Sequence, residues 1–98
     1  MSASLISSAD LDARRRRALF RSWHRGMREM DLLMGRFADA QIADLSETEL
    51  ADYELLMEVQ DRDIYAWLTG QLQAPPAYDT AVFRKLKLFH SHAGRLDL

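Results

Sequence analysis

Residues 45–50, Leu45-Ser46-Glu47-Thr48-Glu49-Leu50, carry the clearest local folding signal in the chain. Ser46 and Glu49 stand three residues apart, as in a capping box, in which each side chain bonds the backbone amide of the other residue. Leu45 and Leu50 flank the box at the two positions of a hydrophobic staple. The stretch predicts a helix that begins after Ser46, with a buried face made of Leu50, Tyr53, Leu56 and Met57.

Two further helices are expected before this start. The first begins at Ser8, an N-cap residue with acids close behind it, and runs to about Trp23. Gly26 separates it from a second helix, about 27–41. The apolar residues of the first stripe are Leu11, Ala18, Leu19, Phe20 and Trp23; those of the second are Met30, Leu33, Met34 and Phe37.

Two more helices are expected after it. Asp61 is placed to cap a short helix that Gly70 ends, with Ile64, Trp67 and Leu68 on its apolar face. The segment 71–78, which contains two adjacent prolines, is expected to be a linker. A fifth helix follows Asp79, and its stripe is Val82, Leu86 and Phe89.

The fold class that follows is all-α: a single small domain, a compact bundle of about five short helices. No window of the 98 residues alternates apolar and polar side chains as a strand requires. Each helix is too short to be stable alone in water, so the helices must form by packing on one another. We expect one domain over residues 1–98, with about 1–8 and 92–98 flexible.

Composition excludes several classes of protein. The chain has no cysteine, hence no disulfide scaffold, thiol nucleophile or cysteine-ligated metal. No apolar run approaches the roughly 18–20 residues that span a bilayer, and residues 1–13 contain no base, unlike a signal or transit peptide. We therefore expect a cytoplasmic protein that does not associate with membranes.

Charge is segregated along the chain. Residues 14–36 hold eight arginines and two acids, whereas residues 39–79 hold ten acids and one arginine. The run Arg14–Arg17 has two interpretations: a phosphate-binding face on the first helix, or a solvated face with salt links to the acidic segment. We favour the second, and we place Phe20 and Trp23 in the core rather than on a base-stacking surface.

Catalytic machinery is not recognisable. No serine lies in a glycine elbow, and no glycine-rich phosphate loop occurs. His90 and His92 could share a metal by their spacing, but no third ligand is near in sequence, and we expect two exposed polar residues at a helix end. The chain is therefore expected to be neither an enzyme nor a metal protein.

The segment 23–31, Trp-His-Arg-Gly-Met-Arg-Glu-Met-Asp, has two interpretations from its chemistry. In the first it is a helix corner: Gly26 takes a positive φ, and Glu29 caps the next helix or pairs with Arg25. In the second interpretation it is a protruding surface that docks against a partner protein. Gly26 then permits close approach of another backbone, Met27 supplies an adaptable apolar contact, and the polar donors are His24, Arg25 and Arg28.

The residues Arg25-Gly26-Met27-Arg28-Glu29 resemble the Arg-Gly-x-x-Glu motif of the small succinate dehydrogenase assembly factors, the SdhE-type flavinylation factors. The resemblance covers about residues 14–90. It includes Trp23, Met30-Asp31-Leu32-Leu33, Phe37, Leu55-Leu56 and the run Asp61-x-Asp63-Ile64-x-x-Trp67-Leu68.

This resemblance implies a five-helix protein that binds the flavoprotein subunit of succinate dehydrogenase and, in some bacteria, of fumarate reductase. It would promote covalent attachment of FAD to that subunit, and the FAD would belong to the client. Arg25, Gly26 and Glu29 match the motif that meets the client, and Met27, Arg28 and Asp31 flank it.

Two residues outside the docking set, and one substitution within it, carry expectations of their own. Trp67 fits the core, and Gly35 receives no role. Gly26→Val should leave the fold mostly intact and lower flavinylation. The alternative function is a small helical adaptor or a nucleic-acid-associated regulator that uses the arginine-rich first helix.

Overall fold

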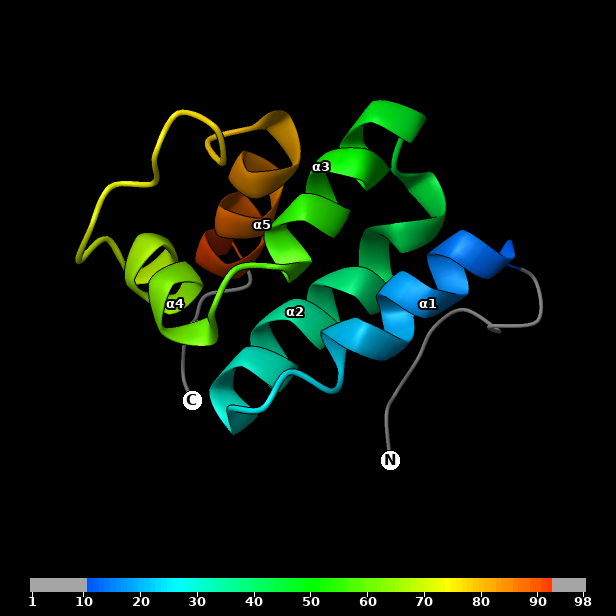
Figure 1. Ribbon diagram of the computed structural model, residues 1–98, viewed down its shortest axis with the longest axis horizontal. Helices are drawn as coiled ribbons and strands as arrows, with labels where there is room; N and C mark the ends of the chain where they lie inside the picture. The colour runs from blue at the N-terminus through cyan, green and yellow to red at the C-terminus, as the bar shows by residue number, and fades with distance from the viewer. Residues whose placement is uncertain (1–10, 93–98) are drawn as a thin grey trace.

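Helices account for all the regular structure in residues 11–92, the part of the chain that the computed structural model describes (Figure 1). The elements are α1 (Ala13–Ser22), α2 (Arg28–Gln41), the short 3-10 helix η2 (Ile42–Asp44), α3 (Glu47–Met57), α4 (Asp61–Thr69) and α5 (Ala81–His92). The expected all-α class with five helices is confirmed.

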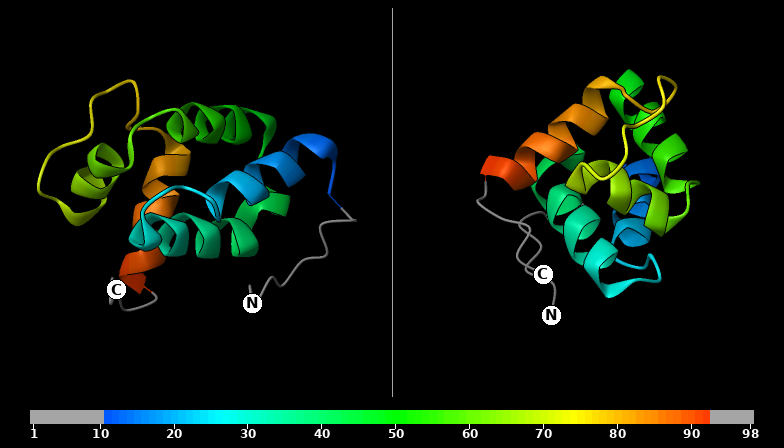
Figure 2. Two further views of the ribbon diagram at one scale, coloured as in Figure 1. Left: turned by 60° about the horizontal axis from the view of Figure 1, so that its bottom comes forward. Right: turned by 90° about the vertical axis from the view of Figure 1, so that its left-hand side faces the viewer.

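The helices enclose one core. α1 lies along α2, α3 packs against α1 and α5, and α5 also contacts α2. α4 stands at one end of the molecule, and the linker to α5 loops outward beside it (Figures 1 and 2). The completely buried large side chains come from several elements, among them Met30, Phe37, Ile42, Tyr53, Ile64 and Leu86.

The capping box at the start of α3 is confirmed. The Glu49 amide donates to Ser46 Oγ at 3.1 Å, and the Ser46 amide donates to Glu49 Oε1 at 3.0 Å. Both leucines of the staple, Leu45 and Leu50, are buried. Lys85 of α5 lies 2.8 Å from the Glu49 carboxylate, and its hydrogen bond lowers the pKa of that carboxyl. The box therefore also ties α3 to α5.

Two helix starts differ from expectation. α1 begins at Ala13 with the extended residue Asp12 as its N-cap, so the expected start at Ser8 is too early, and Ser8 itself lies outside the described residues. α4 begins at Asp61, and Gln60 is the N-cap. Asp61 is not the cap because its carboxylate is engaged elsewhere. The end of α4 is as expected, with Gly70 at a φ of +85°.

The expectation that Phe20 belongs to the core is wrong. Its side chain is 63% exposed, whereas Ala18, Leu19 and Ser22 form the buried face of α1. Successive residues of a helix turn by about 100°, so Ala18, Ser22 and Leu19 share one side of α1, and Phe20, one step beyond Leu19, falls on the other side.

The expectation for His90 is also wrong. The side chain is buried, and its Nε2–H donates to the Leu33 carbonyl at 2.7 Å. His90 follows Leu86 by four residues, which places both on one face of α5. The side chain of His92 lies outside the described residues, and within those residues no group of three or more potential metal ligands occurs.

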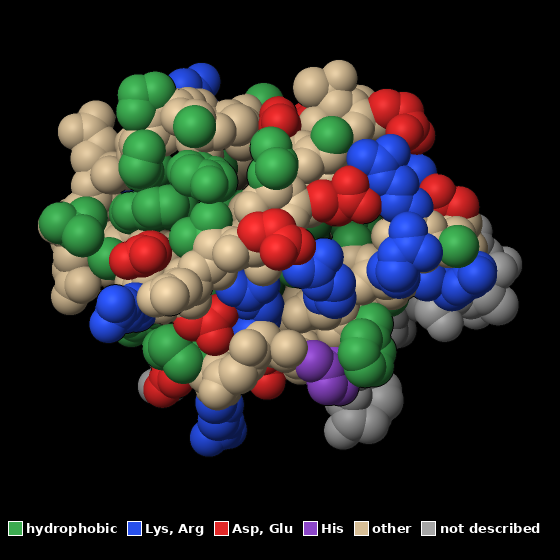
Figure 3. Space-filling model, viewed as in Figure 1, with side chains coloured by type: hydrophobic (Ala, Val, Ile, Leu, Met, Phe, Trp, Pro, Cys, Tyr) green, Lys and Arg blue, Asp and Glu red, His purple; other side chains and the backbone are tan. Residues whose placement is uncertain are grey.

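Three arginines of α1, Arg14, Arg15 and Arg21, pair with the acidic segment, as expected. Arg14 lies 2.8 Å from Glu54 and 3.0 Å from Glu47, and Arg21 lies 2.8 Å from Glu58. Basic side chains consequently gather over α1 with acids beside them (Figure 3). None of the helices in the described part is long and apolar enough to cross a membrane.

Candidate partner-binding corner

The corner comprises residues 23–31, the loop between α1 and α2 together with the first turn of α2. At its centre the Arg25 side chain points inward and is only 8% exposed. Its Nη1 donates to the Met57 carbonyl and its Nη2 to the Val59 carbonyl, each at 2.7 Å. These carbonyls lie at the end of α3, where the last C=O groups lack partners within the helix. Arg25 therefore caps the C-terminus of α3.

Asp61 completes this arrangement from the first residue of α4. Its Oδ1 accepts from Arg25 Nε at 2.8 Å, and its Oδ2 accepts from the Met27 amide at 3.2 Å. The Arg25 amide in turn donates to the Asp31 carboxylate in the first turn of α2. We call the set Arg25, Asp31 and Asp61 the clasp. It joins the α1–α2 loop to the α3–α4 junction.

The clasp corrects two expectations. Arg25 was expected either to pair with Glu29 or to offer its donors to a partner, but its donors are directed to Asp61 and the end of α3. Glu29 does not cap α2, whose N-cap is Met27 without a side-chain hydrogen bond, and the Glu29 side chain is exposed.

Trp23 anchors the other end of the loop on α2. A Cβ atom added to Gly35 would lie 2.3 Å from Trp23 Cδ2, and Trp23 Nε1 donates to Asp39 Oδ1 at 3.3 Å. The expectation that Gly35 has no role is therefore wrong, because only glycine leaves room for the indole. The sequence placed Gly35 in a helix but carried no sign of what lies over it.

Gly26 has a φ of +129°, which L-residues with side chains rarely adopt. A Cβ at this position would lie 3.5 Å from Asp61 Oδ2, an ordinary contact, so the backbone and not crowding is what requires glycine. This confirms the expected positive φ. A valine at this position would strain the backbone, so Gly26→Val is expected to lower stability as well as flavinylation.

The remaining residues of the corner reach solvent. His24, Gly26, Arg28 and Glu29 are exposed, and Met27 is half-buried. The clasp thus fixes the backbone from inside while a mixed surface of two charges, an imidazole, a thioether and bare backbone faces outward. Such a surface suits recognition of another protein and contains no arrangement for covalent catalysis.

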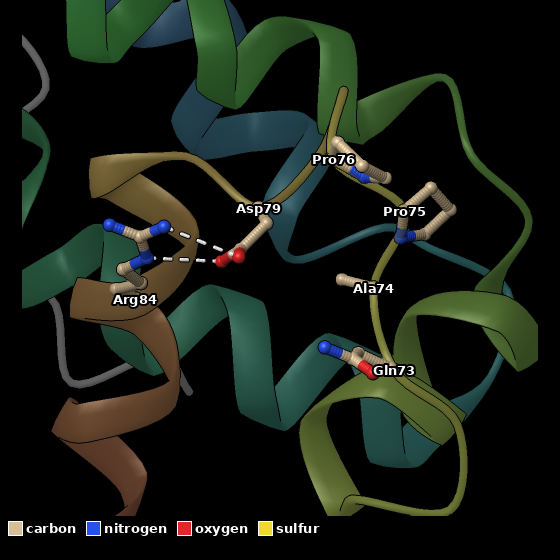
Figure 4. Close-up of a pocket in the computed structure, with 6 residues that line it drawn as sticks. All are labelled: Gln73, Ala74, Pro75, Pro76, Asp79 and Arg84. Carbon is tan, nitrogen blue, oxygen red and sulfur yellow. Dashed lines mark hydrogen bonds and ion pairs between the residues drawn. The ribbon is translucent and has the colours of Figure 1, made fainter.

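A hollow lies apart from the corner, between the α4–α5 linker and the start of α5 (Figure 4). Its lining includes Gln73, Pro75 and Pro76. Arg84, the cation at its rim, is held by Asp79 through two hydrogen bonds of 3.0 and 3.2 Å. Among the lining residues that the structure describes, the cation is thus engaged in an exposed ion pair.

Comparison with known proteins identifies the family. Residues 16–90 match the family described as "Flavinator of succinate dehydrogenase". The chain is 38% identical over 84 residues to a protein of Dictyostelium discoideum named succinate dehydrogenase assembly factor 2, mitochondrial; the match spans 86% of this chain and 57% of that protein. It is 39% identical over 85 residues to the FAD assembly factor SdhE of Acetobacter pasteurianus, covering 87% and 78% of the two chains.

A Drosophila mojavensis protein named succinate dehydrogenase assembly factor 2-B, mitochondrial, is 39% identical over 88 residues, 88% of this chain and 56% of that protein. The chain thus spans a little over half the length of these two eukaryotic relatives. It belongs to the family of flavinators of succinate dehydrogenase. This is a family of assembly factors, which agrees with the expectation that the chain is not an enzyme.

Proposed function

We propose that this chain binds the flavoprotein subunit of succinate dehydrogenase through the corner and promotes covalent attachment of FAD to that subunit. Family membership supports the partner and the process. The observation that supports the site is the clasp: a nearly buried ion pair between Arg25 and Asp61 holds a loop whose neighbouring side chains are exposed. A preformed loop loses little conformational entropy when it docks.

The roles of the residues in the corner follow from whether their side chains are exposed or buried. Gly26, Met27, Arg28 and Glu29 meet the client, together with His24 at the edge. Arg25 and Asp31 act through the backbone that they hold. The corner supplies no nucleophile, so it acts by binding one arrangement of the client more tightly than others and raising the population of that arrangement. The attachment reaction itself needs the reacting side chain of the client and the flavin in near-attack geometry.

FAD is assigned to the client rather than to this chain. The sequence has no glycine-rich phosphate loop, and Arg84 at the linker hollow is engaged by Asp79. The cytoplasmic setting and a second client, the flavoprotein subunit of fumarate reductase, belong to the same proposal. Co-expression with that second subunit tests it in the same way as the experiment below.

The test is covalent flavin on co-expressed succinate dehydrogenase flavoprotein subunit, read by fluorescence of the denatured subunit in a gel. We expect strong fluorescence with this chain and little without it. Glu29→Ala should lower the signal at least about fivefold, because an exposed motif carboxylate is removed without loss of an internal contact. Asp44→Ala, an exposed acid on η2, is the matched control and should have no effect. Equal fluorescence with and without folded wild-type chain would overturn the function.

A further inference from the structure

Phe20 is the one aromatic residue among the large hydrophobic side chains that are exposed in residues 11–92. Its ring stacks on the ring of His24, with centroids 4.0 Å apart and planes inclined by 18°. His24 Nδ1–H donates to the Phe20 carbonyl at 2.7 Å. The two rings therefore form an ordered platform on the surface.

The platform continues a row along the outer face of α1. Arg16 and Phe20 lie four residues apart on the same side of α1. His24, two residues beyond the end of the helix, extends the row through its stacking on Phe20. All three are exposed. Arg16 Nη1 donates to the Leu11 carbonyl at 2.6 Å, and within the described residues its guanidinium forms no ion pair. The row ends beside Arg25 and Gly26, at the corner.

We propose that this row, Arg16, Phe20 and His24, is a second docking surface for the flavoprotein subunit, and that it receives an acidic segment of the subunit carrying an apolar side chain. The inference rests on the proposed function. Within residues 11–92 Arg16 forms no ion pair, so its charge favours negative charge on the partner. The exposed ring of Phe20 gains from burial against an apolar group. The row and the corner are continuous, so one client can cover both.

Charge favours a protein over a nucleic acid as the occupant. Arg14 and Arg21, which could have extended a phosphate-binding face, are paired with Glu54 and Glu58 of α3. A polyanion on this helix would therefore approach those carboxylates as well as Arg16. A protein segment with a few acids avoids this repulsion because its charge is local.

The test is the dissociation constant of the full chain with the isolated flavoprotein subunit, measured by calorimetry. Phe20→Ala should raise it at least about tenfold, as expected for an aromatic anchor of an interface. Leu88→Ala is the matched control: Leu88 is 54% exposed on α5, and its variant should bind within twofold of wild type. Circular dichroism establishes that both variants are folded.

A second variant tests the charge. Arg16→Gln should weaken binding about three- to fivefold at low salt, with the difference disappearing near 0.5 M salt because screening removes an exposed attraction. The proposal is overturned if wild type binds the subunit and Phe20→Ala binds equally well. It is also overturned if Phe20→Ala loses affinity for a fluorescent single-stranded oligonucleotide and not for the subunit. If wild type does not bind the subunit at all, the proposed function fails together with this inference.

Discussion

The indole of Trp23 lies directly over Gly35, so close that a Cβ on Gly35 would stand 2.3 to 2.6 Å from three atoms of the ring. Gly35 is in the middle of α2, a position where glycine normally weakens a helix by about 0.5–1 kcal/mol relative to alanine. In this protein the glycine allows the close contact with Trp23, and that contact fixes the position of the first residue of the corner. Buried Asp39, one turn further on, receives the indole N–H.

Gly35→Ala should therefore destabilise the protein by about 1–2 kcal/mol, because crowding of a packed site outweighs the gain in helix propensity. Urea denaturation followed by circular dichroism measures the change. In a Trp23→Ala background the clash is absent, and the same substitution should instead stabilise α2 slightly. An unchanged midpoint for Gly35→Ala in the wild-type background contradicts the close packing.

Asp61→Asn should cost about 2–4 kcal/mol in the free energy of unfolding, because it leaves the nearly buried Arg25 guanidinium without its countercharge. Glu58→Gln is the control: it breaks the exposed pair with Arg21 and should cost well under about 1 kcal/mol. Denaturation of both variants decides the point. If they lose the same small amount, the clasp does not hold the corner.

Gly26→Ala and Gly70→Ala compare two glycines with positive φ, +129° and +85°. Both substitutions strain the backbone, by about 1–3 kcal/mol each, and Gly26 should lose more because its φ is further from the left-handed helical region. Only Gly26→Ala should also lower flavinylation of the client, since Gly70 lies at the end of α4 with open space around it. Equal flavinylation by the two variants would remove Gly26 from the docking surface.

The salt dependence of binding should distinguish the two arginines of the motif, Arg25 and Arg28. Arg28→Ala removes an exposed cation, so its loss of affinity for the flavoprotein subunit should shrink as salt is added. Arg25→Ala should lower stability and affinity by amounts that salt hardly changes, since the group is 8% exposed. Lys87→Ala, an exposed cation on α5, controls for general charge. A strongly salt-dependent effect of Arg25→Ala contradicts its inward orientation.

His90 should make stability depend on pH. Burial lowers the pKa of His90 below its ordinary value of 6.5, and the nearby Arg36 acts in the same direction. As the pH falls below about 6.5, the unfolded chain therefore binds a proton before the folded chain does. The free energy of unfolding should decrease with a slope of at most about 1.4 kcal/mol per pH unit, and level off below the folded pKa.

His90→Gln can keep a donor for the Leu33 carbonyl and removes this titration, so its stability should vary less between pH 6.5 and 5. Glu49 and Glu54 also have lowered pKa values, but their contribution is lost only below about pH 4.5 and is common to both proteins. Parallel curves for wild type and His90→Gln above pH 5 would contradict a buried neutral imidazole.

Structural features that depend on residues close together in the sequence could be predicted. The capping box of Ser46 and Glu49 and the end of α4 at Gly70 were both expected and found. The buried face of α3 was also expected, since its spacing is that of one helix face. Two predictions were wrong because the buried face of a helix was assigned incorrectly. Phe20 was included in the buried face of α1 but is exposed. His90 was left out of the buried face of α5, although it shares that face with Leu86.

The sequence by itself determined the helices, their buried faces and the resemblance to the family, because these depend on residues three or four positions apart and on an ordered motif. Only the tertiary structure decided that Arg25 caps α3 and binds Asp61, 36 residues away, and that Gly35 receives Trp23. Such contacts depend on how α1 and α2 pack against the α3–α4 junction. The hydrophobic pattern requires that packing without specifying which polar groups it brings together.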